Sequence, residues 1–411
     1  MSKFIQILFL VLLPFYPFWA WLCFSFTNKP FEVLISILLT PIAFYFLLFI
    51  NKKLPSYLIL LILFSIYHLC SAFINDTIPK DTSKIYFILQ DFHVRACLFF
   101  IIIENSNFNR QFIIRMNIFI LIILAASVVV SIIQIKIPTF FFNNSPLENS
   151  TYLRDSRSAS IYSWTNLNSL GISFPILISI LVSVYNKSKS TLSIVIFSGI
   201  VVSFLSKARY IMISSLVVLS QLFFNTKISI VKKVSFVMIF LVGIYLFDLG
   251  ATKLGYNIAD VINNRILEKE TDMESAKARI TSYEVFMVVF PENPWFGVGP
   301  ETKQNVINML GGEAPLIHIG YLSYLYFYGL IGSLILFGAI FFLVRDAWIV
   351  GRKCNFWGSF YGLISFCIAN LTFVYFNLSE MGIVISLIYL RYYSYKSALD
   401  SLENLMSKKI S

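Results

Sequence analysis

The sequence predicts an all-α, polytopic integral membrane protein of about twelve transmembrane helices, and three observations carry that prediction. Hydrophobic residues make up 58% of the 411 residues, charged residues only 13%, and the mean hydropathy is +0.78. A chain this apolar falls outside the range of soluble globular proteins. Crossing roughly 30 Å of hydrocarbon takes about 20 apolar residues, and about a dozen such runs follow one another between short polar breaks. We therefore expect residues 1–411 to form a single polytopic membrane domain.

The apolar runs place the expected spans at about 4–26, 31–50, 54–74, 86–103, 112–135, 166–185, 190–206, 210–224, 234–247, 318–343, 356–375 and 379–394. The first run is longer than a signal-peptide core and lacks a small-residue cleavage site, so we expect a retained helix. The fourth run contains Asp91, His93 and Arg95. Two interpretations stay open there: the span starts nearer Phe92, or the charges face a polar cavity.

Charge sets the expected orientation, because lysine and arginine concentrate in cytoplasmic loops. Placing the N-terminus inside collects more than half of the 32 lysines and arginines on the inner face with few of the 21 acids. Both termini are then cytoplasmic, and the net charge of +11 reflects topology and not nucleic-acid binding. Two long segments face outward, 136–165 and 248–317. In the second, apolar spacing predicts short helices over Asn257–Glu270 and Met273–Val289, with Pro291 and Pro294 ending the latter.

The cysteines give no sign of a disulfide framework or a metal site. All five, Cys23, Cys70, Cys97, Cys354 and Cys367, lie in or beside expected spans, and the sequence has no CxxC or Cys/His spacing. We predict that they are small apolar residues, and we expect no metal or cofactor.

Four arginines fall on the expected outer side, where the positive-inside rule disfavours them: Arg157, Arg209, Arg265 and Arg279. A guanidinium presents a rigid fork of donors that matches phosphate oxygens, so converging arginines suit a lipid-linked phosphate or pyrophosphate. The alternative for Arg209, which follows Lys207 in a tight turn, is simple snorkelling to headgroups. Arg265 has Glu268 three residues on and is expected to form an ordinary exposed pair, whereas Arg279 lacks a local partner.

The stretch from Phe296 to Gly332 adds a histidine and several glycines. A neutral imidazole at His318 can accept a proton from a sugar hydroxyl, although a lone interfacial histidine is more often only a polar tip. The FGVG turn at 296–299 lacks the strand and helix of a phosphate cradle, so we expect it to reverse the chain. Gly329 and Gly332 are predicted to be close-packing sites.

Taken in order, these motifs are similar to those of one family. They are RSASIYSWTNLNSLG from Arg157, LSKAR ending at Arg209, Arg279 followed by ENPWFGVG, and HIGYLSYLYFYGLIG from His318. Together they resemble the bacterial O-antigen polymerase and O-antigen ligase superfamily over roughly Arg157 to Gly332. The sequence departs from the family in having Ile319 where members often have asparagine after the histidine, and SKAR in place of S-x-S-R.

The resemblance implies a metal-independent glycosyltransferase of GT-C-like fold at the outer face of the bacterial inner membrane. Its substrates would be undecaprenyl-pyrophosphate-linked oligosaccharides, with a chain-length regulator as a further partner. The resemblance assigns catalysis to His318, Arg209 and Arg279, and pyrophosphate binding to Arg157, Arg209 and Arg279, with Arg265 ranked lower. The missing His-Asn pair favours a polymerase over a ligase. A flippase fits twelve spans but not the long outer loop or the lack of an internal repeat.

Overall fold

The computed structural model describes residues 2–27, 30–49, 53–78, 82–137, 140–141, 158, 160–162, 167–206, 208–224, 231, 234, 238, 242, 245, 273–300, 319–372 and 376–410. At 2, 24, 167–168, 209, 224, 273–279 and 399–410 the description covers the backbone alone. Every regular element in these ranges is helical. The expected helix Asn257–Glu270 and the expected span 234–247 lie outside the described residues or touch them only at isolated positions.

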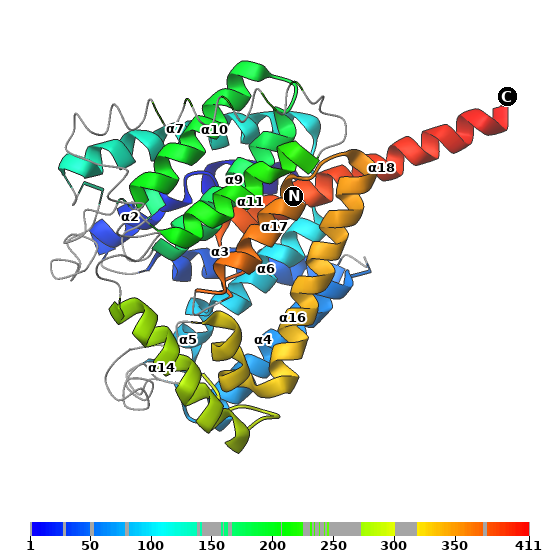
Figure 1. The fold of residues 1–411 in the computed structure, drawn as a ribbon. Helices are drawn as coiled ribbons and strands as arrows, with labels where there is room; N and C mark the ends of the chain where they lie inside the picture. Colours follow the sequence, from blue (N-terminus) through cyan, green and yellow to red (C-terminus); the bar gives the residue numbers. More distant parts are fainter. Residues whose placement is uncertain are drawn as a thin grey trace.

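Six of the described helices begin and end within two residues of a predicted span, and Figure 1 shows how the helices are arranged. In chain order they are α1 (Ser2–Leu12), α2 (Tyr16–Thr27), α3 (Phe31–Phe49), α4 (Ser56–Ile74), α5 (Lys84–Gln90), α6 (Phe92–Asn105), α7 (Arg110–Lys136), η2 (Ser160–Tyr162), α9 (Leu167–Val184), α10 (Lys189–Ser206), α11 (Arg209–Phe224), α14 (Met273–Val289), η4 (Phe290–Glu292), α16 (Gly320–Cys354), α17 (Gly358–Ala369) and α18 (Met381–Ile410). Helix α14 confirms the predicted helix Met273–Val289.

Five described helices, α3, α4, α7, α10 and α16, are long and apolar enough to cross a membrane, and up to seven spans result if each bent helix pair is one span. Helix α7 exposes Ile114, Ile118, Ile122 and Val129 along one side. Large apolar side chains at this spacing form a continuous apolar stripe along the helix. Exposing such a stripe to water is unfavourable, whereas lipid chains can pack against it. The chain is therefore a helical membrane protein, and the count of about twelve spans remains a prediction.

Two expected spans are bent. The bend corrects the prediction of 4–26 as a single helix, and in the fourth span it favours the interpretation that the helix starts nearer Phe92. Helices α1 and α2 meet at 70° across residues 13–15. Pro14 and Pro17 explain the break, because proline donates no backbone hydrogen bond and clashes with the preceding turn. Helices α5 and α6 meet at 58°. Asp91 accepts hydrogen bonds from the backbone N–H groups of His93 and Val94 at 2.9 and 2.8 Å, so it caps a new helix that starts at Phe92.

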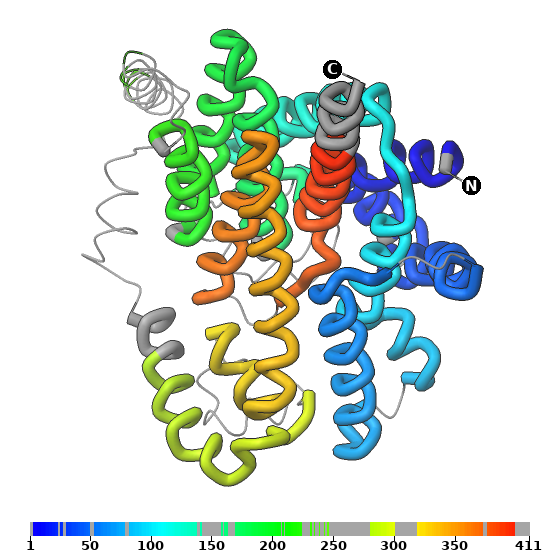
Figure 2. The backbone as a smooth tube through the Cα atoms, turned by 90° about the vertical axis from the view of Figure 1, so that its right-hand side faces the viewer, coloured from blue at the N-terminus to red at the C-terminus, as the bar shows by residue number. Residues whose placement is uncertain are grey.

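The expected span 318–343 is also wrong as a single straight helix, because α16 is broken at Gly329, which has φ 60° and ψ −166°. We name residues 320–328 the first arm and residues 330–354 the second arm. The rings of Tyr321 and Phe337 lie 5.4 Å apart, whereas sixteen residues of unbroken helix would separate them by about 24 Å. The second arm therefore folds back along the first, as the yellow and orange segments show in Figure 2.

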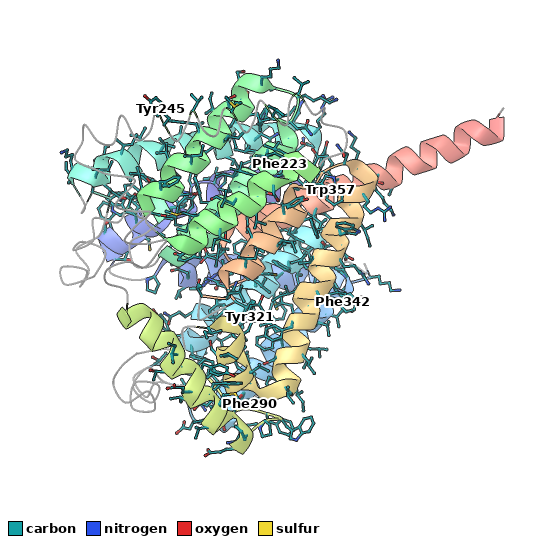
Figure 3. All side chains as sticks on the ribbon, in the orientation of Figure 1. Phe223, Tyr245, Phe290, Tyr321, Phe342 and Trp357 are labelled. Atoms are coloured by element: carbon teal, nitrogen blue, oxygen red, sulfur yellow. The ribbon has the colours of Figure 1, made fainter. Side chains whose placement is uncertain are left out.

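The PWFGVG segment, residues 294–299, joins the two arms through four backbone hydrogen bonds. Val298 and Gly299 donate to the last carbonyls of the first arm, at Tyr326 and Phe327, over 3.2 and 2.8 Å. The first amides of the second arm, at 330 and 331, donate to the carbonyls at 294 and 295 over 2.8 and 3.1 Å. The segment thus satisfies groups that a broken helix leaves unpaired. In Figure 3, Phe290 marks this end of the molecule and Tyr321 the other end of the first arm.

Small residues set the packing of the C-terminal half. A Cβ atom at Gly358 of α17 would lie 2.8 Å from the Cα of Ile180, and one at Gly382 of α18 would lie 2.6 Å from the Cα of Ser173. The hydroxyl of Ser179 donates to the carbonyl of Gly358 at 2.7 Å. Such close approach of backbones is how helices gain contact in lipid, where apolar burial gives no advantage. It brings the end of α17 and the start of α18 to the start of α9.

Candidate functional site: converging helix starts

Four described helices start around the end of α17, and hydrogen bonds fix their relative positions. The N–H of Gly382 in α18 donates to the hydroxyl of Ser173 in α9 at 3.1 Å. Arg95 in the first turn of α6 donates through Nε to the hydroxyl of Ser379, just before α18, at 3.1 Å. The N–H of Gly320, the first residue of α16, donates to the carbonyl of Asn370 at the end of α17, at 3.2 Å.

Helix α11 joins this group because it runs beside α9 and α17. Gln221 near its end donates to the carbonyl of Ser179 at 3.3 Å, and Ser214 nearer its start donates to the carbonyl of Ser365 at 3.4 Å. The start of α11 therefore lies on the same side as the starts of α9 and α18. We name the region where α6, α9, α11, α16 and α18 begin the helix-start cluster.

A chain of polar side chains runs through the helix-start cluster. Ser379 accepts from Arg95 and donates to Oδ1 of Asn377 at 2.7 Å. The amide of Asn377 donates to Oε1 of Glu380 at 2.9 Å, and Ser169 donates to the same oxygen at 3.0 Å. Arg95 is only 4% exposed. A buried guanidinium is retained only where polar partners surround it. Here the partners are Ser379, just before α18, and the carbonyl of Gln90 at the end of α5.

The arrangement favours an anionic ligand. The first N–H groups of a helix have no partner within it, and the helix dipole places partial positive charge at the same end. Several starts that face one region therefore add positive potential that favours phosphate oxygens. The N–H groups of α6, α16 and α18 named above already have acceptors within the protein. Glu380 brings a carboxyl group into the cluster, and its hydrogen bonds to Ser169 and Asn377 direct it into the protein network.

Of the predicted site residues, only Arg209 is described at the start of a cluster helix, and no side chain of the set is among those described. Arg209 is the first residue of α11 and Arg279 lies in α14, each with only its backbone described. Arg157, Arg265 and His318 lie outside the described residues.

Residues close in sequence to Arg157 and His318 are described, and their hydrogen bonds show where these parts of the chain lie. The N–H of Ser158 donates to the carbonyl of Leu205 at the end of α10, at 3.0 Å, close to the start of α11. Gly320 is held at the end of α17 by its bond to Asn370. The chain next to 157 and the chain leading into α11 are thus brought together, and the chain that follows 318 enters the helix-start cluster.

No sequence pattern indicated Glu380 and its partners. Asp91, His93 and Arg95 stand out as charges within an apolar run, and the structure favours the interpretation in which the helix starts at Phe92. The sequence signal for Glu380 is the polar run Asn377 to Glu380 beside the last predicted span. A polar run in that place normally indicates only the boundary of a helix.

The described residues contain no group of three or more His, Cys, Asp or Glu side chains able to hold a metal ion. A separate cavity of about 270 Å³ lies between α4, α6, α16 and α18, lined by Tyr57, Glu104, Asp346 and Arg391 among others. Tyr57 donates to Glu104, which lies 3.7 Å from Arg391. These residues lie at the opposite ends of α6 and α16 from the helix-start cluster.

A family model described as O-antigen ligase matches residues 192–337. The match runs from the first turn of α10 into the second arm of α16, and includes Arg209, Arg265, Arg279 and His318. It confirms the resemblance to the O-antigen polymerase and ligase superfamily and supports O-antigen polymerase or ligase activity as a class. No curated protein matches the chain.

Proposed function

We propose that this membrane protein, whose residues 192–337 match the O-antigen ligase family model, is an O-antigen polymerase. It joins undecaprenyl-pyrophosphate-linked oligosaccharide repeat units at the periplasmic face of the bacterial inner membrane. The observation that carries the proposal is the helix-start cluster, because Arg209 occupies the first position of α11 inside the matched region.

In the proposed reaction, a hydroxyl of the acceptor sugar attacks the anomeric carbon of the donor oligosaccharide. A glycosidic C–O bond forms, and the bond between the anomeric carbon and the pyrophosphate oxygen breaks. Undecaprenyl pyrophosphate leaves with the bonding electron pair, and the hydroxyl proton passes to a base, for which we propose His318. Negative charge grows on the leaving group, so groups placed to receive it stabilise the transition state more than the substrate.

We propose Arg157, Arg209 and Arg279 as the groups that bind the pyrophosphate, with Arg265 in a lesser role. A planar guanidinium forms two parallel hydrogen bonds with phosphate oxygens, and the nearby helix starts add fixed dipoles. Removing one such donor costs about 3 to 4 kcal/mol of transition-state stabilisation, a hundredfold to a thousandfold in rate. The proposal gives these arginines the charge compensation that a metal cation supplies in other transferases.

The frame we propose for this site is a GT-C-like domain of about twelve spans with both termini in the cytoplasm. The segments 136–165 and 248–317 then lie in the periplasm, on the same face as the helix-start cluster. A chain-length regulator is the expected protein partner. Support comes from the distribution of basic residues and from the apolar helices.

Arginine variants test the site. Arg209→Ala and Arg279→Ala should leave the protein inserted and abundant but abolish long O-antigen chains on a lipopolysaccharide gel. Arg345→Ala is the matched control, because this arginine is exposed on the second arm and pairs with the adjacent Asp346 at 2.9 Å. Wild-type ladders from both site variants would refute the pyrophosphate assignment.

The second candidate is an O-antigen ligase, which the description of the matching family model favours. A deletion strain separates the two. Loss of a polymerase leaves core that carries a single repeat unit, whereas loss of a ligase leaves bare core. A flippase also leaves bare core, but the purified protein would then form no polymer from lipid-linked repeat units.

A further inference from the structure

The first arm of α16 rests on two buried histidines. The hydroxyl of Tyr328 lies 2.7 Å from Nδ1 of His68 on α4, and that of Tyr324 lies 3.0 Å from Nε2 of His93 on α6. All four side chains are buried, with exposed fractions from 0 to 5%. The two tyrosines are one helical turn apart, so they present their hydroxyls to α4 and α6 along one side of the arm.

One carboxylate organises both histidines. Oδ2 of Asp91 lies 2.8 Å from Nε2 of His68, and Oδ1 accepts the backbone N–H of His93 at 2.9 Å. A proton on Nε2 of His68 satisfies this contact and leaves Nδ1 as the acceptor for the hydroxyl of Tyr328. Asp91 therefore sets the tautomer of one histidine and the helix position of the other.

Apolar packing alone would hold this arm without the cost of burying charge. The ring of Phe64 already contacts those of Tyr324 and Tyr328 at 6.0 and 5.1 Å. Ionisable groups within a membrane bundle are expensive and mark functional positions, and replacing buried pairs by apolar residues is often neutral for stability. Asp91 and His68 add an orientation that apolar packing does not give. The hydrogen bond between His68 and Tyr328 fixes how far the first arm is rotated about its own axis.

Rotation of this arm matters for the proposed function because of where the arm ends. Gly320 lies about 12 Å along the helix axis from Tyr328, at the helix-start cluster, and follows His318 by two residues. The break at Gly329 fixes the other end through the PWFGVG segment. A displacement of about 1 Å at a reacting group can cost a hundredfold in rate.

We propose that Asp91 and His68 are positioning residues, which hold Tyr328 and thereby orient the first arm and the base that precedes it. This inference rests on the proposed function, in which His318 takes the proton of the acceptor hydroxyl. The pair does not touch substrate. It acts through the arm, so it affects turnover and not the binding of the donor pyrophosphate.

The experiment uses purified full-length protein and lipid-linked repeat units. Tyr328→Phe removes only the hydroxyl, and Asp91→Asn keeps an oxygen that caps α6 while removing the charge. Each should lower kcat about tenfold with an unchanged donor KM. Tyr45→Phe, a tyrosine that is 40% exposed on α3, is the matched control and should retain wild-type kcat.

A double-mutant cycle tests the route. In a His318→Ala background, Tyr328→Phe should cause no further loss, because the arm then has no base to orient. Equal losses in both backgrounds would overturn the proposal, as would wild-type kcat in both single variants or a raised donor KM with unchanged kcat.

Amide hydrogen exchange supplies a readout that does not depend on turnover. Tyr328→Phe should increase exchange within residues 320–328 and leave α10 unchanged. Unaltered exchange in the arm would defeat the inference even if the protein transfers no glycan. A different outcome would separate the two proposals. Faster exchange in Tyr328→Phe, together with full activity in Arg209→Ala and Arg279→Ala, would support the role of the arm contact and refute the proposed function.

Discussion

Gly329→Ala should destabilise the protein strongly, because two independent costs fall on one methyl group. The backbone at 329 has φ 60° and ψ −166°, a region open essentially to glycine, and a residue with a side chain there is strained by about 1 to 3 kcal/mol. The new Cβ would also lie 2.4 Å from the carbonyl of Trp295. Overpacking of this kind costs about 1 to 3 kcal/mol more, so we expect a total loss of about 2 to 6 kcal/mol.

Gly338→Ala is the matched control on the second arm. Its nearest neighbour would be the flexible end of Leu60 at 3.3 Å, and alanine favours helix over glycine by about 1 kcal/mol. The assay is the melting of detergent-purified protein, followed as loss of the monodisperse peak in size-exclusion chromatography. Gly329→Ala should melt well below wild type and Gly338→Ala at or above it. Equal melting of the two variants would refute our account of the break.

Three further predictions concern contacts elsewhere. Gly382→Ala, whose Cβ would lie 2.6 Å from the Cα of Ser173, should destabilise the protein by about 1 to 3 kcal/mol in the same melting assay. Tyr67→Phe should cost about 1 to 2 kcal/mol, because the hydroxyl lies 2.8 and 3.1 Å from the carbonyls of Phe296 and Tyr328; wild-type melting would contradict that role. Ile118→Asp, on the exposed stripe of α7, should reduce the amount of protein in the membrane fraction, since a central charge costs about 2.5 to 3.5 kcal/mol on insertion.

The lengths of the apolar runs predicted much of the fold, because the hydrocarbon of a membrane places the same constraint on every span. Backbone groups in hydrocarbon must be paired within the segment, so an apolar run of about 20 residues has little choice but helix. The bounds of α3, α4, α7 and α10 follow the predicted runs closely for that reason. The breaks at Pro14 and Gly329 escaped prediction because each depends on a single residue, whereas a helix start near Phe92 was one of the two interpretations of the fourth span.

Gly329 shows why sequence patterns do not predict such helix breaks. Its neighbours 320–328 and 330–354 are apolar and helical, and glycine also occurs within straight membrane helices. What opens the helix is the PWFGVG segment, thirty residues earlier in the chain, which supplies partners for the carbonyls and amides that the break releases. The sequence correctly predicted that Gly329 and Gly332 are close-packing sites, and chain reversal at the FGVG turn stays a prediction. It did not predict that the two features contact each other.

The candidate site was predictable in part for a similar reason. Each arginine on the outer side of a membrane protein can be identified individually from the predicted topology. The positive-inside rule therefore singles out Arg209 and Arg279 without any knowledge of their contacts. Polar partners such as Ser169 and Asn377 are ordinary residues at helix ends. Their role depends on Glu380 and Arg95 meeting them from α18 and α6, which no local pattern encodes.

The start of α6 carries the strongest argument that the first half of the chain takes part in the site. The family model begins at residue 192, yet within five residues Asp91 holds His68 and, through it, the first arm of α16, while Arg95 holds the start of α18. The first arm and the start of α18 both border the helix-start cluster. Because burial of Asp91 and Arg95 is tolerable only with these partners in place, the packing of α6 and the assembly of the cluster are coupled. Substitutions at either residue should therefore disturb elements more than two hundred residues away in the sequence.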